Sequence, residues 1–278
     1  MDKKVILITG ASSGLGKAAA EYLAEKGFIV YGTSRKTPVT CHQACSEPAK
    51  ESPVTMLQMD VTKPESVQAA VQTIIAEHGR IDAVVNNAGM GIGGALELAT
   101  PEEIALQMNT NFMGTVNVCN AVIPHLRRAG GGKIINLSSI GGVMGIPFQG
   151  FYSASKFAIE GYSETLSLEL QPFKIKVVLV EPGDFATGFT AARIVSEQTK
   201  NSELYSEKFA KCMAIIEKEE NGGCKPIKLA KLMYQIIKSK RPKFRYKVGN
   251  MVQTNFARAK AIIPARTYQA LLRFFYNM

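Results

Sequence analysis

The chain has 278 residues, of which 46% are hydrophobic and 20% are charged, as in an ordinary globular protein with one sizeable core. The formal net charge is +10. The Lys and Arg residues form no run of five or more and match no zinc-finger, RRM or basic-zipper spacing, so nucleic acid is not the expected partner.

The cysteines and the N-terminus give little sign of export or metal binding. Five cysteines are irregularly spaced, and the cluster Cys41, His42 and Cys45 lacks a second ligand pair, so we expect no metal site. Only four apolar residues follow Lys4 before a turn, too few for a signal peptide, and no apolar run is long enough to span a membrane. The sequence therefore predicts a cytoplasmic protein.

Apolar runs alternate with amphipathic segments over the first two thirds of the chain. The runs predict six strands, at residues 5–8, 28–33, 54–59, 81–85, 133–137 and 176–180. The segments between them predict helices at residues 17–26, 64–78, 101–128 and 152–170. Strands that alternate with helices favour βαβ units, and hence a doubly wound Rossmann-type α/β fold with a parallel sheet covered by helices on both faces.

The remaining segments are assigned by composition. Residues 36–53 are polar and predict a long loop, and residues 89–94 predict a glycine-rich one. After residue 185 the chain is polar and amphipathic, which indicates a helical substrate lid over residues 186–221, and residues 242–248 favour a last strand. The tail, residues 253–278, suits a docking helix, an oligomer contact or a membrane-surface helix, with core packing or subunit contact preferred. We expect one domain over residues 1–278, with a cofactor-binding core to about residue 185.

A glycine-bearing turn, Thr9-Gly-Ala-Ser-Ser-Gly-Leu-Gly16, follows the first strand and opens a helix. Glycines at 10, 14 and 16 let the backbone turn tightly and approach a pyrophosphate, and the helix N-terminus offers free N–H groups to it. Ser12 and Ser13 could add hydroxyl hydrogen bonds. A plain tight turn is the alternative, but the position after the first strand favours phosphate binding.

The end of the second strand selects between cofactors. An acidic residue there binds the ribose 2′-OH of NAD, whereas Arg accommodates the 2′-phosphate of NADP. The sequence reads Thr33-Ser34-Arg35-Lys36, without Asp or Glu, and Lys17 follows the glycine turn. These cations favour NADP(H), with NAD(H) left open, over the alternative that they are simple surface charges.

Tyr152 and Lys156 are four residues apart on a predicted helix, so they share one face. A nearby lysine cation favours the phenolate and should lower the tyrosine pKa, which would suit the phenol to exchange a proton with a carbonyl or an alcohol. Ser139 follows the fifth strand, where ligands bind in open α/β sheets, and its hydroxyl could hydrogen-bond the substrate oxygen. A helix cap or loop bond is the alternative role for this serine.

Taken together, these motifs resemble the short-chain dehydrogenase/reductase family. The glycine turn matches the family's T-G-x-x-x-G-x-G element, and the trio Ser139, Tyr152 and Lys156 matches its active site. Further matches are Asp60-Val61, Asn86-Asn87-Ala88-Gly89, the helix asparagine Asn111, and Pro182-Gly183 with Thr187, all in the family's order. The resemblance covers residues 5–190, and the Tyr31-Gly-Thr-Ser-Arg35 segment is similar to the steroid- and retinol-type branch.

This resemblance implies the role of each matching residue. Tyr152 would be the general acid/base, Lys156 would bind the nicotinamide ribose, Ser139 would orient the substrate oxygen, and Asn111 would connect a proton relay to solvent. The expected cofactor-binding residues are Gly10, Ser12, Ser13, Gly14, Leu15, Gly16, Arg35, Asp60, Val61, Asn87, Ala88, Gly89, Tyr152, Lys156, Pro182, Gly183 and Thr187. The expected activity is interconversion of a carbonyl and a secondary alcohol, in a homodimer or homotetramer formed through the helices that contain Asn111 and Tyr152.

The substrate is expected from a set of apolar side chains. They are Phe185, Phe189, Ile194, Val195, Met213, Ile215 and Ile216 in the lid, and Met90, Ile92, Met144, Ile146 and Phe148 before it. Either they line a pocket for a lipophilic, steroid- or retinoid-like ketone or alcohol, or they only pack the lid. A non-catalytic NADP(H)-sensing module is the main alternative function, and a nucleotide-sugar epimerase or dehydratase is another.

Overall fold

The computed structural model describes residues 3–36 and 54–278. Seven parallel strands form its central sheet, in the order β3-β2-β1-β4-β6-β7-β9. They are β1 (Val5–Ile8), β2 (Ile29–Ser34), β3 (Val54–Gln58), β4 (Ala83–Asn86), β6 (Gly132–Leu137), β7 (Ile175–Pro182) and β9 (Arg245–Val248). The strand order reverses between β1 and β4, where doubly wound sheets bind their ligands. The predicted doubly wound α/β fold is confirmed.

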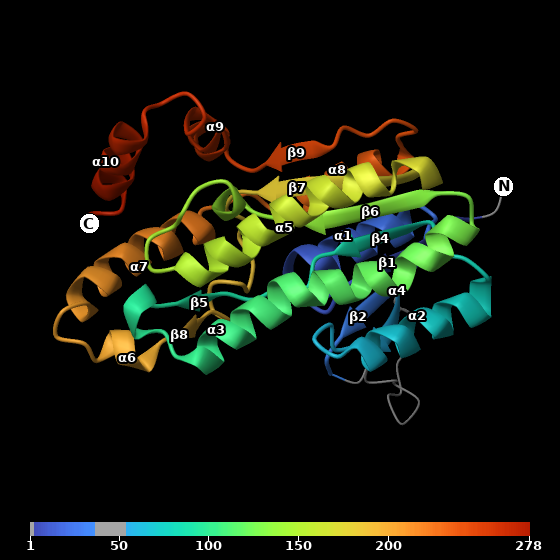
Figure 1. The fold of residues 1–278 in the computed structure, drawn as a ribbon, viewed down its shortest axis with the longest axis horizontal. Helices are drawn as coiled ribbons and strands as arrows, with labels where there is room; N and C mark the ends of the chain where they lie inside the picture. The colour runs from blue at the N-terminus through green and yellow to red at the C-terminus, as the bar shows by residue number, and fades with distance from the viewer. Residues whose placement is uncertain (1–2, 37–53) are drawn as a thin grey trace, which may run out of the picture.

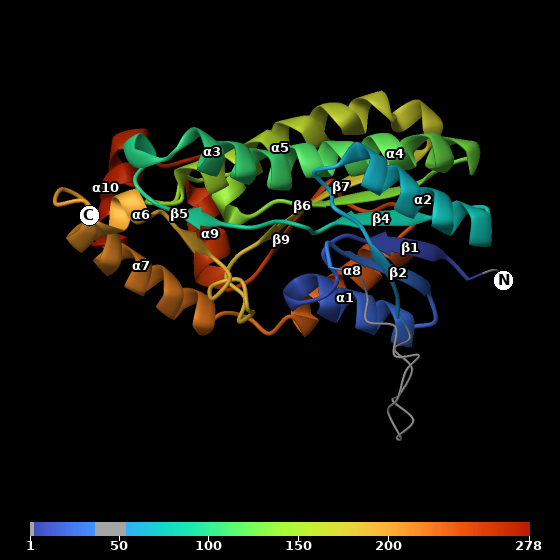
Figure 2. The ribbon, with the colours of Figure 1, turned by 90° about the horizontal axis from the view of Figure 1, so that it is seen from below.

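Helices cover both faces of the sheet (Figure 2). On one face lie α2 (Pro64–His78), α4 (Gly114–Arg128) and α5 (Gly150–Glu169), and on the other lie α1 (Gly14–Glu25) and α8 (Ile227–Lys238). Alternate residues of β1 serve the two layers, since Leu7 packs in the cluster under α2 and α4 and Ile8 in the cluster under α1 and α8. Burial on both faces explains why the strands are continuous apolar runs.

The helix predicted over residues 101–128 is interrupted in the structure. It consists of α3 (Pro101–Met108), a π-helical turn (Asn109–Met113) and α4. Thr100 caps α3, because its hydroxyl accepts from the Glu103 N–H at 3.2 Å while the Glu103 carboxylate accepts from the Thr100 N–H. The sequence pattern does not reveal the π turn, since one extra residue in a turn leaves the apolar face almost continuous.

Apart from α8 and β9, the chain after residue 185 gathers at the carboxyl ends of the strands (Figure 1). It forms α6 (Glu197–Lys200), α7 (Ser206–Asn221), α9 (Met251–Ala259), α10 (Ala265–Phe275) and β8 (Ile194–Val195), which pairs in parallel with β5 (Ile92–Gly93). Only the second half of the predicted lid helix is helical, because residues 186–196 form turns and β8. Helix α8 was not predicted. Single 3₁₀ turns occupy Leu96–Leu98, Ile140–Gly142 and Gln171–Phe173.

Buried ion pairs fasten the last strand to the sheet. Arg245 of β9 lies 2.6 Å from a carboxylate oxygen of Glu160 on α5 and 2.6 Å from one of Glu181 on β7, and Lys247 lies 3.3 Å from Glu181. Because breaking such a network would leave buried charge unpaired, these ion pairs hold β9 against β7 and α5.

Two predictions concern residues that lie outside the described ranges. The loop expected at residues 36–53, except Lys36, lies outside the described residues, and so does the cluster of Cys41, His42 and Cys45. Within residues 3–36 and 54–278, no group of three His, Cys, Asp or Glu side chains could hold a metal ion. No helix in the same ranges is long and apolar enough to cross a membrane.

Candidate active site

The glycine turn is built around Asn87. Gly10 and Gly14 have positive φ angles of 66° and 55°, which favour glycine. The Asn87 side-chain amide donates to the carbonyl oxygens of Thr9, at 2.9 Å, and of Gly10, at 3.1 Å. In return the Thr9 hydroxyl accepts from the backbone N–H groups of Asn87 and Ala88. Asn87, predicted to bind the cofactor, therefore also holds the turn in shape.

Gly16 packs tightly against Asn87 and Gly10 within the turn. It does not lie on the wall of the cavity described below, unlike the rest of the predicted turn residues. A Cβ atom at this position would lie 2.3 Å from Asn87 Nδ2 and 2.4 Å from the Gly10 oxygen. Its missing side chain therefore serves the packing of the turn, and its contact with a cofactor stays a prediction.

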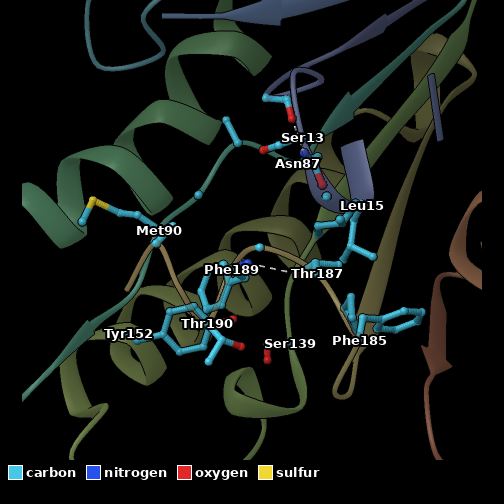
Figure 3. Close-up of a pocket in the computed structure, with 18 of the residues that line it drawn as sticks. Ser13, Leu15, Asn87, Met90, Ser139, Tyr152, Phe185, Thr187, Phe189 and Thr190 are labelled. Carbon is cyan, nitrogen blue, oxygen red and sulfur yellow. Dashed lines mark hydrogen bonds between the residues drawn. The ribbon is translucent and has the colours of Figure 1, made fainter. Parts of the chain in front are cut away.

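One large cavity, of about 2030 Å³, crosses the carboxyl end of the sheet. This volume is roughly twice the upper end of the usual range for a small-molecule site, about 300–1,000 Å³, so it can hold more than one small ligand. Its wall contains every predicted cofactor-binding residue except Gly16, and all the predicted catalytic residues except Asn111. In Figure 3, Ser13, Leu15 and Asn87 lie at one side of the close-up, and Tyr152, Ser139 and Thr190 lie at another.

The α1 end of the cavity suits an anion. Helix α1 begins without a side-chain cap, because the Ser13 hydroxyl makes no capping hydrogen bond, so its first N–H groups face the cavity. The exposed side chains of Lys17, Arg35 and Lys36 also line it. Phosphate groups on a ligand would meet both the helix dipole and these cations.

Asp60 follows β3 at the same end of the cavity. Its carboxylate accepts from the Thr62 N–H at 3.0 Å and from the Thr62 hydroxyl at 2.7 Å. Burial alone would raise the pKa of Asp60, but these hydrogen bonds and the charges of Lys63 and Arg35 bring the pKa below its usual value. Asp60 is therefore ionised at neutral pH, and its carboxylate is held in place by Thr62.

The candidate catalytic trio comes from two elements. Tyr152 and Lys156 lie in the first turns of α5, and Ser139 ends the segment after β6. Gly141 packs between them, since a Cβ atom there would lie 3.3 Å from the Tyr152 ring and 3.4 Å from the Ser139 hydroxyl oxygen. The Lys156 Nζ lies 5.8 Å from the centre of the Tyr152 ring. The structure thus brings the three predicted side chains together at the cavity wall.

The protonation of this trio differs from the sequence-based expectation. Burial raises the pKa of Tyr152 to about 12, although a hydrogen bond with Ser139 acts in the opposite direction. Lys156 is not among the groups that lower this pKa, so the predicted downward shift is wrong for this structure. Burial also lowers the pKa of Lys156 to about 8. At neutral pH the site therefore holds a protonated phenol beside a lysine cation, and the pKa of that lysine is close to the ambient pH.

Asn111 lies behind the cavity wall, inside the π turn. Its side-chain amide donates to the Met90 oxygen and to the Ser155 hydroxyl, each at 3.0 Å, and its oxygen accepts from the Met90 N–H at 2.9 Å. It is fully buried. A Cβ atom on Gly89 would lie 3.3 Å from Asn111 Oδ1 and 3.8 Å from Lys156 Nζ, so the asparagine lies close behind the lysine.

The segment after β7 closes over the glycine turn. Pro182, Gly183 and Thr187 line the cavity, and a Cβ atom on Gly14 would lie 3.6 Å from Thr187. The Thr187 hydroxyl accepts from the Phe189 N–H at 3.2 Å (Figure 3). The Phe189 ring in turn lies 5.9 Å, centre to centre, from the Tyr152 ring. The three predicted residues thus lie between the two ends of the cavity.

An apolar region adjoins Tyr152. Of the side chains predicted for it, half line the cavity: Met90, Met144, Ile146, Phe185, Phe189 and Ile216. The others do not: Phe148, Met213 and Ile215 pack in the cluster beneath α7, and Ile92 pairs with Ile194 in the small sheet beside Val195. The sequence left open whether these apolar side chains line a pocket or pack the lid. Each alternative holds for some of them.

The cavity wall also contains residues that the sequence did not point to. Helices α9 and α10 contribute Val252, Gln253, Phe256, Leu272, Phe275 and Tyr276. The sequence suggested a docking helix in this tail, but no local signal tells which part of the molecule such a helix meets.

Three acidic residues, Asp184, Glu219 and Glu220, line the same end of the cavity. Burial raises the pKa of Asp184 to about 6; the hydrogen bond from Gln253 opposes this, and the charges of the two glutamates add to it. Glu220 forms an ion pair with the buried Arg193 and accepts from the Thr190 hydroxyl at 2.6 Å. The charges of Glu220 and Asp184 also raise the pKa of Tyr152, while the charge of Arg193 lowers it.

Comparison with known proteins places this site in a family. Residues 4–198 match the model of the short chain dehydrogenase family. The chain is a member of that family. It is an oxidoreductase, as the motifs predicted, and the matched range ends where the predicted lid begins to carry its own helices.

Individual short-chain dehydrogenases agree with this assignment. The chain is 57% identical to "3-ketodihydrosphingosine reductase" of Bacteroides thetaiotaomicron, over 99% of both chains. It is 39% identical to human 17-beta-hydroxysteroid dehydrogenase type 1, over 68% of this chain and 59% of that protein, so the resemblance to the steroid-type branch is confirmed.

Solved structures of the family share the fold across nearly the whole chain. A short-chain dehydrogenase from Streptomyces avermitilis is 30% identical, covers 100% of this chain and 97% of its own, and superposes with a TM-score of 0.80. Another, from Burkholderia cenocepacia and in complex with NADP, is 25% identical over 98% of both chains, with a TM-score of 0.70.

Proposed function

We propose that this short-chain dehydrogenase is an NADPH-dependent reductase of a lipophilic α-amino ketone, of the 3-ketodihydrosphingosine type. The observation that carries the proposal is the composition of one continuous cavity. It is cationic at the α1 end, it has Tyr152, Ser139 and Lys156 on its wall, and it is apolar with acidic side chains beyond them. The full-length relative supports the substrate class.

The residues at the α1 end fit an NADP(H) cofactor. The uncapped start of α1 and the glycines with positive φ leave room and N–H donors for a pyrophosphate. Arg35 would hold the 2′-phosphate, as an arginine at this position does in NADP-binding folds, and no acidic residue ends β2 to select NAD(H). When bound, the nicotinamide would supply the hydride.

The side chains then divide the proton chemistry between them. A phenol whose pKa is about 12 stays protonated at neutral pH, which suits Tyr152 to give a proton to a carbonyl oxygen during reduction. The Ser139 hydroxyl would hold that oxygen, and Lys156 would stabilise the negative charge left on the phenol. The buried Asn111 would keep Lys156 and the Gly89 segment in position.

The far end of the cavity fits the proposed substrate class. A 3-ketodihydrosphingosine carries a ketone, a neighbouring amine, a hydroxyl and a long alkyl chain. The carboxylate of Asp184, which lines the cavity and forms no ion pair among the described residues, would attract the ammonium form of the amine. The apolar side chains that line the cavity, Met90 and Phe275 among them, would cover the alkyl chain.

The test is NADPH oxidation, followed by absorbance, against matched ketones. The panel contains 3-ketodihydrosphingosine, the same ketone without the amine, a steroid ketone and a small ketone, each also with NADH. Preference for the amino ketone with NADPH is expected. Equal turnover without the amine would reject the role of the acidic residues, and tight NADPH binding with no turnover of any ketone would favour a non-catalytic NADP(H)-sensing module instead.

A further inference from the structure

The C-terminal end of the chain combines positive charge with exposed apolar side chains. Residues 249–278 contain no Asp or Glu, and their basic residues are Arg258, Lys260, Arg266 and Arg273. All four are exposed. Lys260 donates to the Val143 carbonyl and Arg258 to the Asn255 side-chain oxygen, so Arg266 and Arg273 carry the charge that is most available to other partners. A purely positive surface of this kind attracts anions.

The same segment exposes large apolar side chains to an unusual degree. Phe274 is 89% exposed, Ile262 86%, and both Met251 and Val252 75%. Leu271, Phe274 and Phe275 are spaced three and four residues apart, so they share one face of α10 beside the face that packs on the protein through Tyr268 and Leu272. A cluster of exposed aromatic and aliphatic side chains marks a surface that is covered in use.

This surface borders the mouth of the cavity. Val252 and Phe275 line the cavity and are at the same time 75% and 48% exposed, so they lie where it opens to the outside. Helices α9 and α10 stand at the end of the molecule farthest from the N-terminus (Figure 1). Whatever covers the apolar side chains therefore also lies at the entrance used by ligands.

We propose that α9, α10 and the loop between them dock on the surface of an anionic lipid bilayer, with the mouth of the cavity facing it. An amphipathic helix with basic residues and exposed Phe and Leu binds in this way, lying in the plane of the interface. Neither helix is long enough to span, since α10 has 11 residues. The arginines would meet lipid phosphates while Phe274 and Ile262 enter the boundary of the acyl chains.

Charge favours a bilayer over a second copy of the chain. In a two-fold symmetric contact the same patch meets itself, which would bring the positive side chains of both copies together without an Asp or Glu side chain in residues 249–278 to pair with them. An anionic bilayer instead neutralises every one of them. The consequence for turnover, direct entry of a lipophilic ketone from the bilayer into the cavity, rests on the proposed function, but the docking itself does not.

The docking is tested by sedimentation of the full chain with vesicles, without substrate or cofactor. We expect binding to vesicles of phosphatidylcholine mixed with phosphatidylglycerol, much weaker binding to phosphatidylcholine alone, and release by high salt. Arg266→Gln and Arg273→Gln should each lower the partition coefficient by about fivefold. Phe274→Gln should lower it by about tenfold. The matched control is Leu204→Gln, an equally drastic change at a side chain that is 80% exposed before α7.

The outcomes separate docking from catalysis. If Phe274→Gln and the arginine variants bind anionic vesicles as well as the wild type does, the proposal is overturned. It is also overturned if these variants change only the sedimentation coefficient of the free protein, because a second copy then covers the surface. If vesicles are bound as expected but no ketone is reduced, the proposed function fails while the docking stands. If both hold, Phe274→Gln should slow reduction of a ketone presented in vesicles and leave a small soluble ketone unaffected.

Discussion

The Lys156 ammonium donates a hydrogen bond of 2.9 Å to the Leu137 carbonyl, and its nitrogen lies 5.8 Å from the centre of the Tyr152 ring. The lysine is thus tied to β6 while the tyrosine is one helical turn before it on α5. Because a strand and a helix hold the pair, its geometry does not depend on a flexible loop. This rigidity allows the contributions of the phenol and of the cation to be tested separately.

Replacing Tyr152 with Phe removes the phenol and keeps the ring that packs near Phe189. We expect kcat for ketone reduction to fall by a factor of about 10² to 10⁴, because the variant lacks the hydroxyl that would give the proton to the carbonyl oxygen. NADPH affinity, measured by fluorescence titration, should change little. Tyr234→Phe, on α8 beside Tyr22, is the control. Retained turnover in the Tyr152 variant would remove this residue from the acid role.

Replacing Arg35 with Asp tests the cofactor preference. The new carboxylate should repel a 2′-phosphate and accept from a ribose 2′-OH, so the ratio of kcat/KM for NADPH to that for NADH should fall by about 10- to 100-fold. Arg128→Asp makes the same charge change at the end of α4, outside the cavity wall, and should leave the ratio unaltered. An unchanged ratio in the Arg35 variant would mean that other groups hold the phosphate.

The pH dependence of reduction should report the lysine and not the tyrosine. Burial lowers the pKa of Lys156 to about 8, whereas Tyr152 stays protonated because its pKa is about 12. Raising the pH through about 8 removes the lysine cation, so kcat/KM for ketone reduction should fall there. Lys156→Arg keeps its charge, since an arginine pKa exceeds about 12, and should lose this fall even if its activity is lower throughout. A fall at the same pH in the arginine variant would assign it to another group.

Two glycines provide a matched pair for the packing of the turn. Gly16→Ala places a Cβ atom against Asn87 and the Gly10 oxygen, and the latter is backbone that cannot move aside cheaply. We expect a loss of about 1–3 kcal/mol in the free energy of unfolding, with weaker NADPH binding. Gly161→Ala, in α5, meets no atom within 4 Å and should stabilise the protein by about 0.5–1 kcal/mol. Urea unfolding of both variants measures the difference, and equal effects would contradict the role given to Gly16.

Most of the fold could be predicted because its signals are local. Each central strand is a short apolar run, and Gly27 and Gly79 end α1 and α2 with the positive φ angles, 85° and 70°, that glycine tolerates. The π turn at Asn111 and the helix α8 were missed. The first hardly disturbs the apolar period. The second was missed although turn residues flank it, Gly222 and Gly223 before it and Pro242 after it.

The candidate site was predictable where a motif fixes a residue to the end of a strand or to one helix face. Ser139, Tyr152, Lys156 and the glycine turn are of this kind, and the structure brings them to one wall. Their pKa values were not predictable, because they depend on burial and on Asp184 and Glu220, which approach from other parts of the chain. The same applies to Gly16, whose function is visible only against Asn87.

The amino-acid sequence by itself therefore determined the doubly wound sheet, the glycine turn and the candidate active-site side chains, since these follow from short-range periodicity and spacing. The tertiary structure decided what surrounds them. Helices α9 and α10 are far from Tyr152 along the chain, yet they close its cavity, because β9 joins the sheet beside β7 and carries them to the carboxyl ends of the strands. Which apolar side chains line a cavity, and which remain exposed at its mouth, depends on that long-range packing and has no signature in any local window.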